Sequence, residues 1–531
     1  MGTGKTAVAT RLAEMLGLRF VDTDTIVEQR VGYTVADIFE RNGEAYFRDA
    51  ESEALREVLQ EPGAVISTGG GILLREENGR LLSAAGPLIC LDASPRVIHE
   101  RTRHDGARPL LAGPGDPISR ITALLAERQP SYAKCRVHID TDDLTAEGVA
   151  QAVVEALRED GRAVTLLPGG IKVPVSLRDR SYRIHVGSGC LSRIGCLCPP
   201  KHSQARAAVL ISEALPRRHV DIVERSLVNA GWGVAVLTVP DGEPSKSLQV
   251  ASRLYEELLD ARLDRGSMMF ALGGGVVGDL GGFVAATFLR GIDYAQIPTS
   301  LIAQVDSSIG GKTGVNLSRG KNLVGAFHHP RGVVIDTDVL GTLPPRELRS
   351  GLAEVIKHAA IADAELFEYL ERQIGCVLDL DPLCLRYVIA RNCQIKAEIV
   401  SADPYDRGVR GILNYGHTVG HALEKAAGEW ELRHGEAVAL GIVAESRLAA
   451  RIGISTLEMA ERQEALMRAA GLPSAAERVD FPHAAAAMGL DKKIEYGRLK
   501  VSLVPTIGKA QTLEDVDRVA LENALRSVCA G

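Results

Sequence analysis

The stretch MMFALGGGVVGDLGGFVAATFL, residues 268–289, decides the fold of the larger part of this 531-residue chain. An apolar run leads into three glycines, and a second apolar run rich in small residues follows. The stretch is long and apolar enough to imitate a membrane span, but it contains Asp279 and repeated glycines. We therefore interpret it as a buried strand, a glycine-rich turn and a buried helix.

Further strand-like segments lie on the N-terminal side of this stretch and alternate with helical patterns up to about residue 345. They are KVPVSL (172–177), YRIHVGSG (182–189), AAVLIS (207–212) and GVAVLTV (233–239). Such alternation predicts a parallel sheet covered by helices on both faces. After LPPREL (343–348) the pattern is helical to the end. The predicted class is α/β, with an α/β half followed by an all-helical half.

The chain opens with MGTGKTAVATRL, in which Gly4, Lys5 and Thr6 end the phosphate-loop pattern G-x-x-x-x-G-K-[ST]. Backbone N–H groups and a helix N-terminus bind phosphate in such a loop. A helical stripe of apolar residues follows, and helices alternate with strands such as AVIST (64–68) and PLICLDAS (87–94) to about Gly161. We predict a second α/β unit here, a P-loop domain with a parallel sheet.

The beginning of this loop departs from the pattern. Its first glycine would fall two residues before Met1, and the strand that feeds such a loop is missing. We expect a sheet without its first, central strand, with unpaired backbone groups on the neighbouring strands. Either the start lies upstream, with Met1 an internal residue, or the unit is a decayed remnant. Motifs later in this unit are intact and favour the upstream start, and we expect impaired nucleotide-dependent activity from the chain as it stands.

Composition narrows the class of protein. The chain is 46% hydrophobic and 24% charged, as in ordinary globular proteins. The net charge of 61 − 68 = −7 indicates neither a nucleic-acid nor a membrane partner. The nine cysteines are scattered without a C-x-x-C pair, and no basic segment followed by an apolar run marks a signal peptide. We expect a cytoplasmic protein that acts on small molecules.

The motifs after the phosphate loop give the front unit a family. They are VDTD (21–24), FRDAE (47–51), TGGG (68–71), RPLL (108–111) and ER (127–128). Each alone is typical of a surface charge or a turn. In this order and spacing, together with GTGKT, they resemble shikimate kinase over the whole front unit.

That resemblance implies ATP as donor, with Mg²⁺ held by Thr6 and supported by Asp22. ATP would be bound by Gly2, Thr3, Gly4, Lys5, Thr6, Ala7 and Arg108, the last on a mobile lid. Shikimate would be bound by Asp24, Arg48, Gly70 and Arg128. Asp24 would also be the base for the attacked hydroxyl.

A second group of residues suggests a metal. His417 and His421 stand at i and i+4 of one predicted helix, and His434 begins another. Glu354 precedes Lys357 by one turn. Two histidines and one carboxylate suit a catalytic Zn²⁺, although buried histidines and an i, i+3 ion pair are the plainer alternatives.

Seven motifs then make the rear of the chain, from about residue 175 to the end, resemble 3-dehydroquinate synthase. They are DGEPSK (241–246), GGGVVGD (273–279), PTSLIAQVDSSIGGKTGVN (298–316), KNLVGAFHHP (321–330), LPPREL (343–348), GLAEVIKHA (351–359) and LNYGHTVGHALE (413–424). The glycines at 273, 275 and 278 also match G-x-G-x-x-G, which alone is a weak signal for a dinucleotide.

The resemblance implies NAD and Zn²⁺ or Co²⁺ as cofactors. NAD would be held by Asp241, Glu243, Lys246, Gly275, Asp279, Thr299, Ser300, Lys312, Lys321 and Thr342. The metal would be held by Glu354, His417 and His434. His421 would not be a ligand but would lie beside the ligands or on the phosphate side of the substrate. The substrate, a seven-carbon sugar acid phosphate, would contact Asp306, Lys312, Asn322, Lys357, Lys396, Arg410 and Asn414. Arg290 would act across the interface of a homodimer formed by the synthase unit.

One departure lies in ADPYDRGVR (402–410), where Asp406 stands at a position at which the family commonly has Glu. We expect activity to survive, because the metal and NAD sets are intact. Two other interpretations stay open: a metal-dependent polyol or alcohol dehydrogenase, and an active synthase carrying a non-catalytic kinase-like module. The expected domains are 1–160 (kinase-like), 161–174 (linker), 175–345 (NAD-binding) and 346–531 (helical, metal-binding).

Overall fold

A computed structural model describes residues 2–16, 18–60, 63–103, 116–133, 135, 137–142, 144–159, 171–178, 180–428, 432–476, 479–488, 494–495, 498–514 and 516–529. The chain divides into two compact units, residues 1–169 and 170–531. No helix among the described residues is long and apolar enough to cross a membrane.

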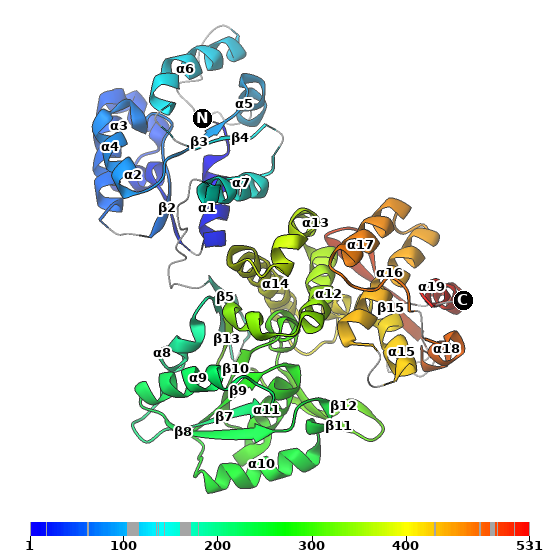
Figure 1. The fold of residues 1–531 in the computed structure, drawn as a ribbon. Helices are drawn as coiled ribbons and strands as arrows, with labels where there is room; N and C mark the ends of the chain where they lie inside the picture. The colour runs from blue at the N-terminus through cyan, green and yellow to red at the C-terminus, as the bar shows by residue number, and fades with distance from the viewer. Residues whose placement is uncertain are drawn as a thin grey trace. The chain divides into compact units, whose positions relative to one another are not determined.

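The front unit (blue to cyan in Figure 1) alternates helices and short strands. Its elements are α1 (Lys5–Leu16), β1 (Arg19–Asp22), α2 (Thr23–Val31), α3 (Val35–Val58), β2 (Ala64–Ser67), η1 (Ile72–Leu74), α4 (Glu76–Ala85), β3 (Ile89–Asp92), α5 (Pro95–Thr102), α6 (Pro117–Tyr132), β4 (Val137–Asp140) and α7 (Ala146–Glu159). The apolar stripe of α1, including Val8, Leu12 and Leu16, is buried as predicted.

The strands of the front unit form two separate parallel pairs, β1 with β2 and β3 with β4. No ladder of hydrogen bonds joins the two pairs within the described part of the unit. This is the arrangement expected of a parallel sheet that lacks its middle strand. The α/β class predicted for the unit is confirmed.

The rear unit contains a seven-stranded sheet in the order β5-β6-β13-β10-β9-β7-β8. All neighbours are parallel except β5 and β6. The strands are β5 (Ile171–Val175), β6 (Tyr182–Gly187), β7 (Arg206–Ser212), β8 (Gly233–Val239), β9 (Met268–Gly273), β10 (Asp293–Pro298) and β13 (Gly332–Asp336). The accompanying elements are α8 (Ile194–Leu197), α9 (Arg217–Asn229), α10 (Leu248–Asp260), α11 (Gly275–Thr287) and the hairpin β11 (Lys312–Leu317) and β12 (Gly320–Phe327).

Both faces of this sheet are buried, as the continuous apolar runs predict. Val209 of β7 packs in a cluster with residues of α9, whereas the next residue, Leu210, packs with α10 and α11 on the other face. Figure 1 shows α9 and α10 on opposite sides of the strands. The quoted stretch 268–289 forms β9 and α11, the buried strand and buried helix that its pattern predicts.

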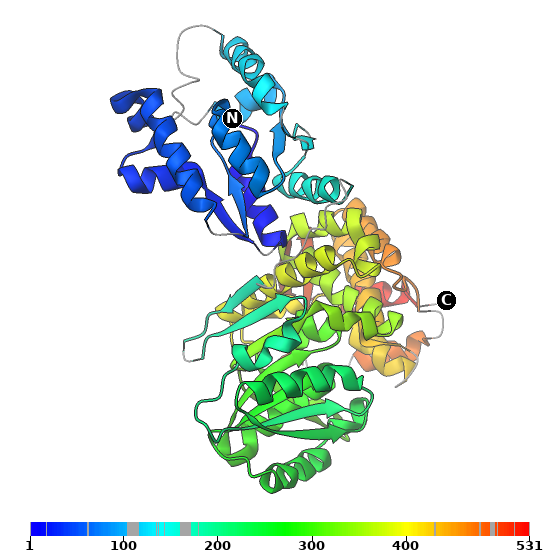
Figure 2. The same ribbon diagram turned by 60° about the vertical axis from the view of Figure 1, so that its left-hand side comes forward.

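The remaining half of the rear unit is mainly helical (yellow-green to red in Figure 2). Its helices are α12 (Pro345–Ala362), α13 (Ala364–Leu378), α14 (Pro382–Ala402), η8 (Val409–Asn414), α15 (His417–Ala427), α16 (His434–Arg451), α17 (Leu457–Ala469), α18 (Phe481–Met488) and α19 (Arg518–Arg526). The prediction that this half is all-helical is wrong at residues 494–514, where β14 (Ile494–Glu495), β15 (Arg498–Thr506) and β16 (Lys509–Glu514) form an antiparallel sheet. Val501, Leu503 and Val504 of β15 are buried, and the left-handed turn at Gly508 (φ 88°) lies between β15 and β16, which together account for the strands.

The expected linker 161–174 also needs correction at its C-terminal end. β5 begins at Ile171 and pairs with β6 along its whole length, with Val173 and Val175 buried. The first strand of the rear sheet therefore starts inside the segment that we assigned to the linker.

Candidate active sites

The phosphate loop of the front unit turns directly into a helix. Gly4 has a left-handed backbone (φ 81°), which favours glycine, and α1 begins at the next residue. The Thr6 hydroxyl donates to Oδ2 of Asp22 at 3.1 Å. Oδ1 of Asp22 in turn accepts from the backbone N–H of Asp24 at 3.0 Å and so caps α2. The loop and the VDTD motif therefore meet, which places the expected Mg²⁺ residues Thr6 and Asp22 together.

A buried cluster of charges lies beside this loop. Arg48 of α3 donates from Nη1 to Oε2 of Glu51 at 2.8 Å, and both side chains are buried. Oδ1 of Asp24 and Oε1 of Glu51 are buried without a hydrogen-bond partner. Burial, and then the negative charge of Glu51, raise the pKa of Asp24 to about 6. A carboxylate with this pKa is suited to take up a proton near neutral pH.

The TGGG turn packs against this cluster without side chains of its own. A Cβ atom on Gly69 would lie 2.4 Å from Oε1 of Glu51, and one on Gly71 would lie 2.2 Å from Nη2 of Arg48. A side chain at either position would therefore displace the carboxylate of Glu51 or the guanidinium of Arg48 from this cluster.

The last expected shikimate residues approach the same turn from α6. The hydroxyl of Tyr132 donates to the carbonyl of Gly70 at 2.6 Å. Arg128, one turn earlier on α6, is buried. Burial raises the pKa of both Tyr132 and Glu51, and the positive charge of Arg128 opposes that rise. The structure thus brings Asp24, Arg48, Gly70 and Arg128 together. Arg108 lies outside the described residues.

In the rear unit, three side chains from three helices converge on one point. The ligand atoms of Glu354 (α12), His417 (α15) and His434 (α16) all lie within 4.8 Å of one another. Nε2 of each histidine is 3.5 Å from Oε1 of Glu354. Both oxygens of Glu354 are buried and lack a hydrogen bond of normal geometry. Two imidazoles and a buried carboxylate, one oxygen of which faces both rings, fit a divalent transition metal.

The two histidines are held by contacts at their other nitrogens. Nδ1 of His417 lies 3.1 Å from the carbonyl of Tyr415, and Nδ1 of His434 lies 3.3 Å from Oε2 of Glu424. These partners direct both Nε2 atoms toward Glu354, the arrangement typical of metal-binding histidines. Burial, followed by the charge of Lys357, holds the pKa of His417 well below its usual range, which keeps the ring neutral. Burial would also lower the pKa of His434, but Glu354 and Glu424 raise it to about 10 in the absence of a metal.

Two neighbours complete this cluster. The ammonium of Lys357 forms a buried ion pair with Glu354. Burial opposes the charge of Glu354, but Lys357 and the histidines hold its pKa below its usual range. The ring of His421 lies 5.2 Å from that of His417 and 6.1 Å from that of His434, yet His421 is not part of the group of converging ligand atoms. It therefore lies beside the metal group, where we expected it.

A second ionic cluster adjoins the first. Nζ of Lys396 on α14 donates to Oδ1 of Asp306 at 2.5 Å, and Nε2 of His358 is 3.6 Å from the same oxygen. Asp306 lies in a short π-helix, Ala303–Ser307, a distortion often found at functional sites. Burial lowers the pKa of Lys396 to about 8, although the Asp306 carboxylate opposes this.

Among the remaining expected substrate residues, Arg410 interacts electrostatically with Asp306 and Lys396 of this second cluster. Arg410 of η8 is buried and donates to the carbonyls of Gly310 at 3.3 Å and of Pro404 at 3.2 Å. Asn414 ends the same short helix. The ammonium of Lys312 pairs with Asp406, the residue that departs from the family pattern. The shorter Asp side chain thus reaches a residue of the expected substrate and NAD sets.

The expected NAD residues gather at the carboxyl ends of the parallel strands. Asp241 and Glu243 follow β8, Gly275 follows β9, and Thr299 and Ser300 follow β10. Ligands bind in this crevice in open parallel sheets.

Hydrogen bonds hold the crevice together. Asp241 accepts from the Ser212 hydroxyl at 2.7 Å, and Glu243 accepts from the Asn316 side chain at 2.6 Å. Lys246 forms a buried ion pair with Asp279 at 2.5 Å.

The other expected NAD residues also have partners. The Thr342 hydroxyl lies 3.1 Å from Nε2 of His219, and Lys321 donates to Glu424 at 2.7 Å. Lys321 thus links the expected NAD set to Glu424, the partner of His434.

Two further expected residues, Asn322 and Arg290, lie in different places in the rear unit. Asn322, with φ 56°, donates its backbone N–H to the Asn316 side chain and belongs to the crevice. Arg290 is exposed and follows the far end of α11, roughly 18 Å along the helix from Gly275. It lies away from the site of its own chain, so its expected role in a dimer stays a prediction.

Several residues of these clusters were missed by sequence reasoning. They are Glu51, Tyr132, Asn316, His358 and Glu424. Glu51 and Glu424 stand within motifs already quoted, three residues after Arg48 and His421, and helical spacing is a signal that would have found both. Asn316 and His358 also stand within quoted motifs, His358 four residues after Glu354 on one helix, whereas nothing in the sequence marks Tyr132.

Comparison with known proteins shows the family of this chain. Family models match at residues 236–350 (3-dehydroquinate synthase N-terminal), 351–494 (3-dehydroquinate synthase C-terminal) and 1–158 (shikimate kinase). The 3-dehydroquinate synthase of a Synechococcus species is 44% identical over 363 residues, 67% of this chain and 99% of that protein. The chain belongs to the 3-dehydroquinate synthase family. The same enzyme of Desulforamulus reducens is 46% identical over 345 residues, 65% of this chain and 96% of that protein.

The front match joins the synthase to a shikimate kinase in one polypeptide, as the motifs predict. Solved structures agree with the fold of the synthase unit. A 2-deoxy-scyllo-inosose synthase complexed with carbaglucose-6-phosphate, NAD⁺ and Co²⁺ is 25% identical, with a TM-score of 0.62, over 67% of this chain and all of that one. A 2-epi-5-epi-valiolone synthase from Streptomyces hygroscopicus with NAD⁺ and Zn²⁺ is 28% identical, with a TM-score of 0.61, over 66% and 98%.

Proposed function

We propose that this fusion of synthase and kinase catalyses two non-adjacent steps of the shikimate pathway. The synthase unit converts 3-deoxy-D-arabino-heptulosonate 7-phosphate to 3-dehydroquinate and phosphate. The kinase unit transfers a phosphoryl group from ATP to shikimate. The observation that carries the proposal is the convergence of Glu354, His417 and His434 in a protein of this family, beside a strand-end crevice.

The residues of the synthase unit fit its two cofactors. Glu354, His417 and His434 would hold Zn²⁺ or Co²⁺, and the crevice beyond β8, β9 and β10 would hold NAD. Bound there, the metal would supply Lewis acidity toward the substrate hydroxyl that is oxidised, and NAD would supply a hydride acceptor.

The cationic side chains around this point bind and orient the acidic substrate. Lys357 and Lys396 are buried ammonium groups, and Arg410 is a buried guanidinium. Such groups match a carboxylate and a phosphate, and their exclusion from water strengthens each contact. Asp306 holds the Nζ of Lys396 in place at 2.5 Å, so the ammonium is positioned before the substrate arrives.

In the kinase unit, too, cationic side chains bind the acidic substrate, and a carboxylate acts as the base. Arg48 and Arg128 bind the shikimate carboxylate, and Asp24 takes the proton of the attacked hydroxyl. Lys5 faces the transferred phosphate, and Thr6 with Asp22 would hold Mg²⁺. The raised pKa of Asp24 suits this role, since its conjugate acid forms at a modest cost near neutral pH.

We also propose a homodimer through the synthase unit, in which Arg290 reaches the site of the second chain. Its exposed position at the far end of α11 supports this role.

The reaction of the full chain with the heptulosonate phosphate, NAD⁺ and Zn²⁺ tests the main proposal. We expect release of one phosphate for each 3-dehydroquinate formed, with no net NADH. Stoichiometric NADH without phosphate would instead indicate a polyol or alcohol dehydrogenase. Synthase turnover without any ATP binding by the front unit would indicate a non-catalytic kinase-like module.

A further inference from the structure

Two neighbouring strands of the kinase unit bring three potential metal ligands to one face. β3 and β4 are parallel and in register, with Cys90 beside His138 and Asp92 beside Asp140. Side chains alternate along a strand, so Cys90 and Asp92 point the same way, and Cys90 shares a face with its register partner His138. These residues belong to neither the phosphate loop nor the cluster around Asp24.

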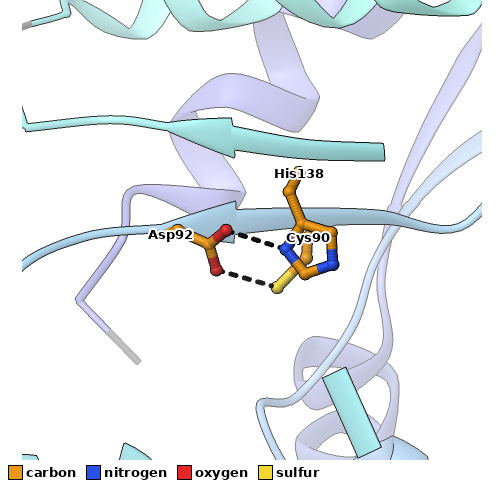
Figure 3. A group of neighbouring side chains, drawn as sticks. All are labelled: Cys90, Asp92 and His138. Carbon is orange, nitrogen blue, oxygen red and sulfur yellow. Dashed lines mark hydrogen bonds and ion pairs between the residues drawn. The ribbon is translucent and has the colours of Figure 1, made fainter. Parts of the chain in front are cut away.

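The three side chains contact one another, as Figure 3 shows. The carboxylate of Asp92 accepts from the Cys90 thiol at 3.3 Å through one oxygen and lies 2.8 Å from Nδ1 of His138 through the other. All three ligand atoms lie within 4.8 Å of one another. Ligands of a tetrahedral Zn²⁺ at bond lengths of about 2.0–2.3 Å stand about 3.3–3.8 Å apart, so small side-chain shifts would complete the geometry.

We propose that Cys90, Asp92 and His138 form a second metal site, which takes Zn²⁺ or a similar thiophilic divalent cation. A thiolate, an imidazole and a carboxylate are a ligand set that favours Zn²⁺ over Mg²⁺ or Ca²⁺. Cys90 is buried, whereas Asp92 and His138 are exposed. The open side admits the cation and leaves a coordination position for water. The bound ion would tie β3 to β4 through side chains as well as backbone.

The cation would replace the protons that now join these groups. Without a metal, the Cys90 thiol donates its proton to Asp92. Its proton would leave on coordination, together with any proton on Nδ1 of His138. Affinity for the cation should therefore increase with pH.

Cobalt absorption of the reduced full-length chain, stripped of metal, tests this site apart from the synthase site. A Co²⁺–thiolate bond gives a charge-transfer band in the near ultraviolet, whereas Glu354, His417 and His434 offer no sulfur. We expect the band in the wild type and in His417→Ala, and its loss in Cys90→Ser. The matched control is Cys196→Ser, which removes an exposed thiol of the rear unit and should leave the band unchanged.

The two exposed ligands, Asp92 and His138, provide a test that does not require substitution of the buried cysteine. Asp92→Asn and His138→Gln should each raise the Co²⁺ concentration at half-maximal band intensity by at least about tenfold, with an unchanged circular dichroism spectrum. The proposal is overturned by a wild type that shows no thiolate band, by a band that survives in Cys90→Ser, or by affinities unaffected in both ligand variants.

Discussion

Nδ1 of His434 lies 3.3 Å from one oxygen of Glu424, and the other oxygen of Glu424 accepts from Nζ of Lys321 at 2.7 Å. This carboxylate thus connects the metal-facing histidine to a lysine of the expected NAD set. It fixes the ring so that Nε2 faces Glu354, and it supports the basicity of that nitrogen.

Glu424→Gln should therefore weaken metal binding without removing a ligand. We expect the Zn²⁺ concentration that restores half of the phosphate release in metal-stripped enzyme to rise about 10- to 100-fold. The control is Glu371→Gln, which breaks only an exposed pair with Arg462. Equal Zn²⁺ requirements in both variants would show that Glu424 does not act on the metal site.

The fall in synthase activity at alkaline pH should reflect the deprotonation of Lys396. Burial lowers the pKa of this lysine to about 8, so it is an ammonium below that pH and neutral above it. We expect kcat/KM for the phosphorylated substrate to fall as the pH rises above about 8. The arginine of Lys396→Arg retains its charge to much higher pH. The loss of kcat/KM should therefore shift to higher pH in this variant, even where the maximal rate is reduced. An identical fall in both enzymes would exclude Lys396 as its source.

In the pH profile of the kinase reaction, the rise in rate on the acid side should depend on Glu51. Burial and then the Glu51 charge raise the pKa of Asp24 to about 6, and the base works only when deprotonated, so the rate should rise with pH through that value. Glu51→Gln removes the neighbouring charge and should shift this rise about 0.5–1 pH unit lower. Glu44→Gln, which alters only the exposed partner of Arg48, should shift it far less. Shikimate phosphorylation measured against pH distinguishes these outcomes, and equal shifts would contradict the assignment.

The buried pair of Lys246 and Asp279 should matter for folding as well as for NAD. Burial raises the pKa of Asp279 despite the nearby ammonium, so removal of that ammonium would leave a carboxylate that burial disfavours. Lys246→Met should lower the free energy of unfolding of the synthase unit by about 3–5 kcal/mol. Adding Asp279→Leu should recover most of that loss, because no charge is then left unpaired. Urea unfolding checks this, and a double variant as unstable as the single one would refute it.

Local patterns were sufficient to predict most of the fold. The glycine stretch at 268–289 forms a strand and a helix because its apolar runs are interrupted only where the backbone must turn. The strands at 498–514 were missed because they lie within a mainly helical segment, and because polar and apolar residues alternate in them over only a few positions. Overall helical character outweighed that short signal.

The candidate sites were predictable in residue type but not in arrangement. Glu354, His417 and His434 stand 63 and 17 residues apart, and no periodicity links such positions. Only the packing of α12, α15 and α16 brings them together. Partners that act through another side chain, such as Glu424 on His434, are equally invisible to spacing between motifs. The pair of Cys90 and His138 follows from strand register, which short strands in a single sequence do not reveal.

Anomalous diffraction from crystals of the full chain with Zn²⁺ and NAD⁺ tests the central claim most directly. We expect a zinc peak within about 2.0–2.2 Å of Nε2 of His417, Nε2 of His434 and a carboxylate oxygen of Glu354, with the nicotinamide beside it. A crystal of enzyme that forms 3-dehydroquinate, yet has no zinc at these three side chains, would contradict the account.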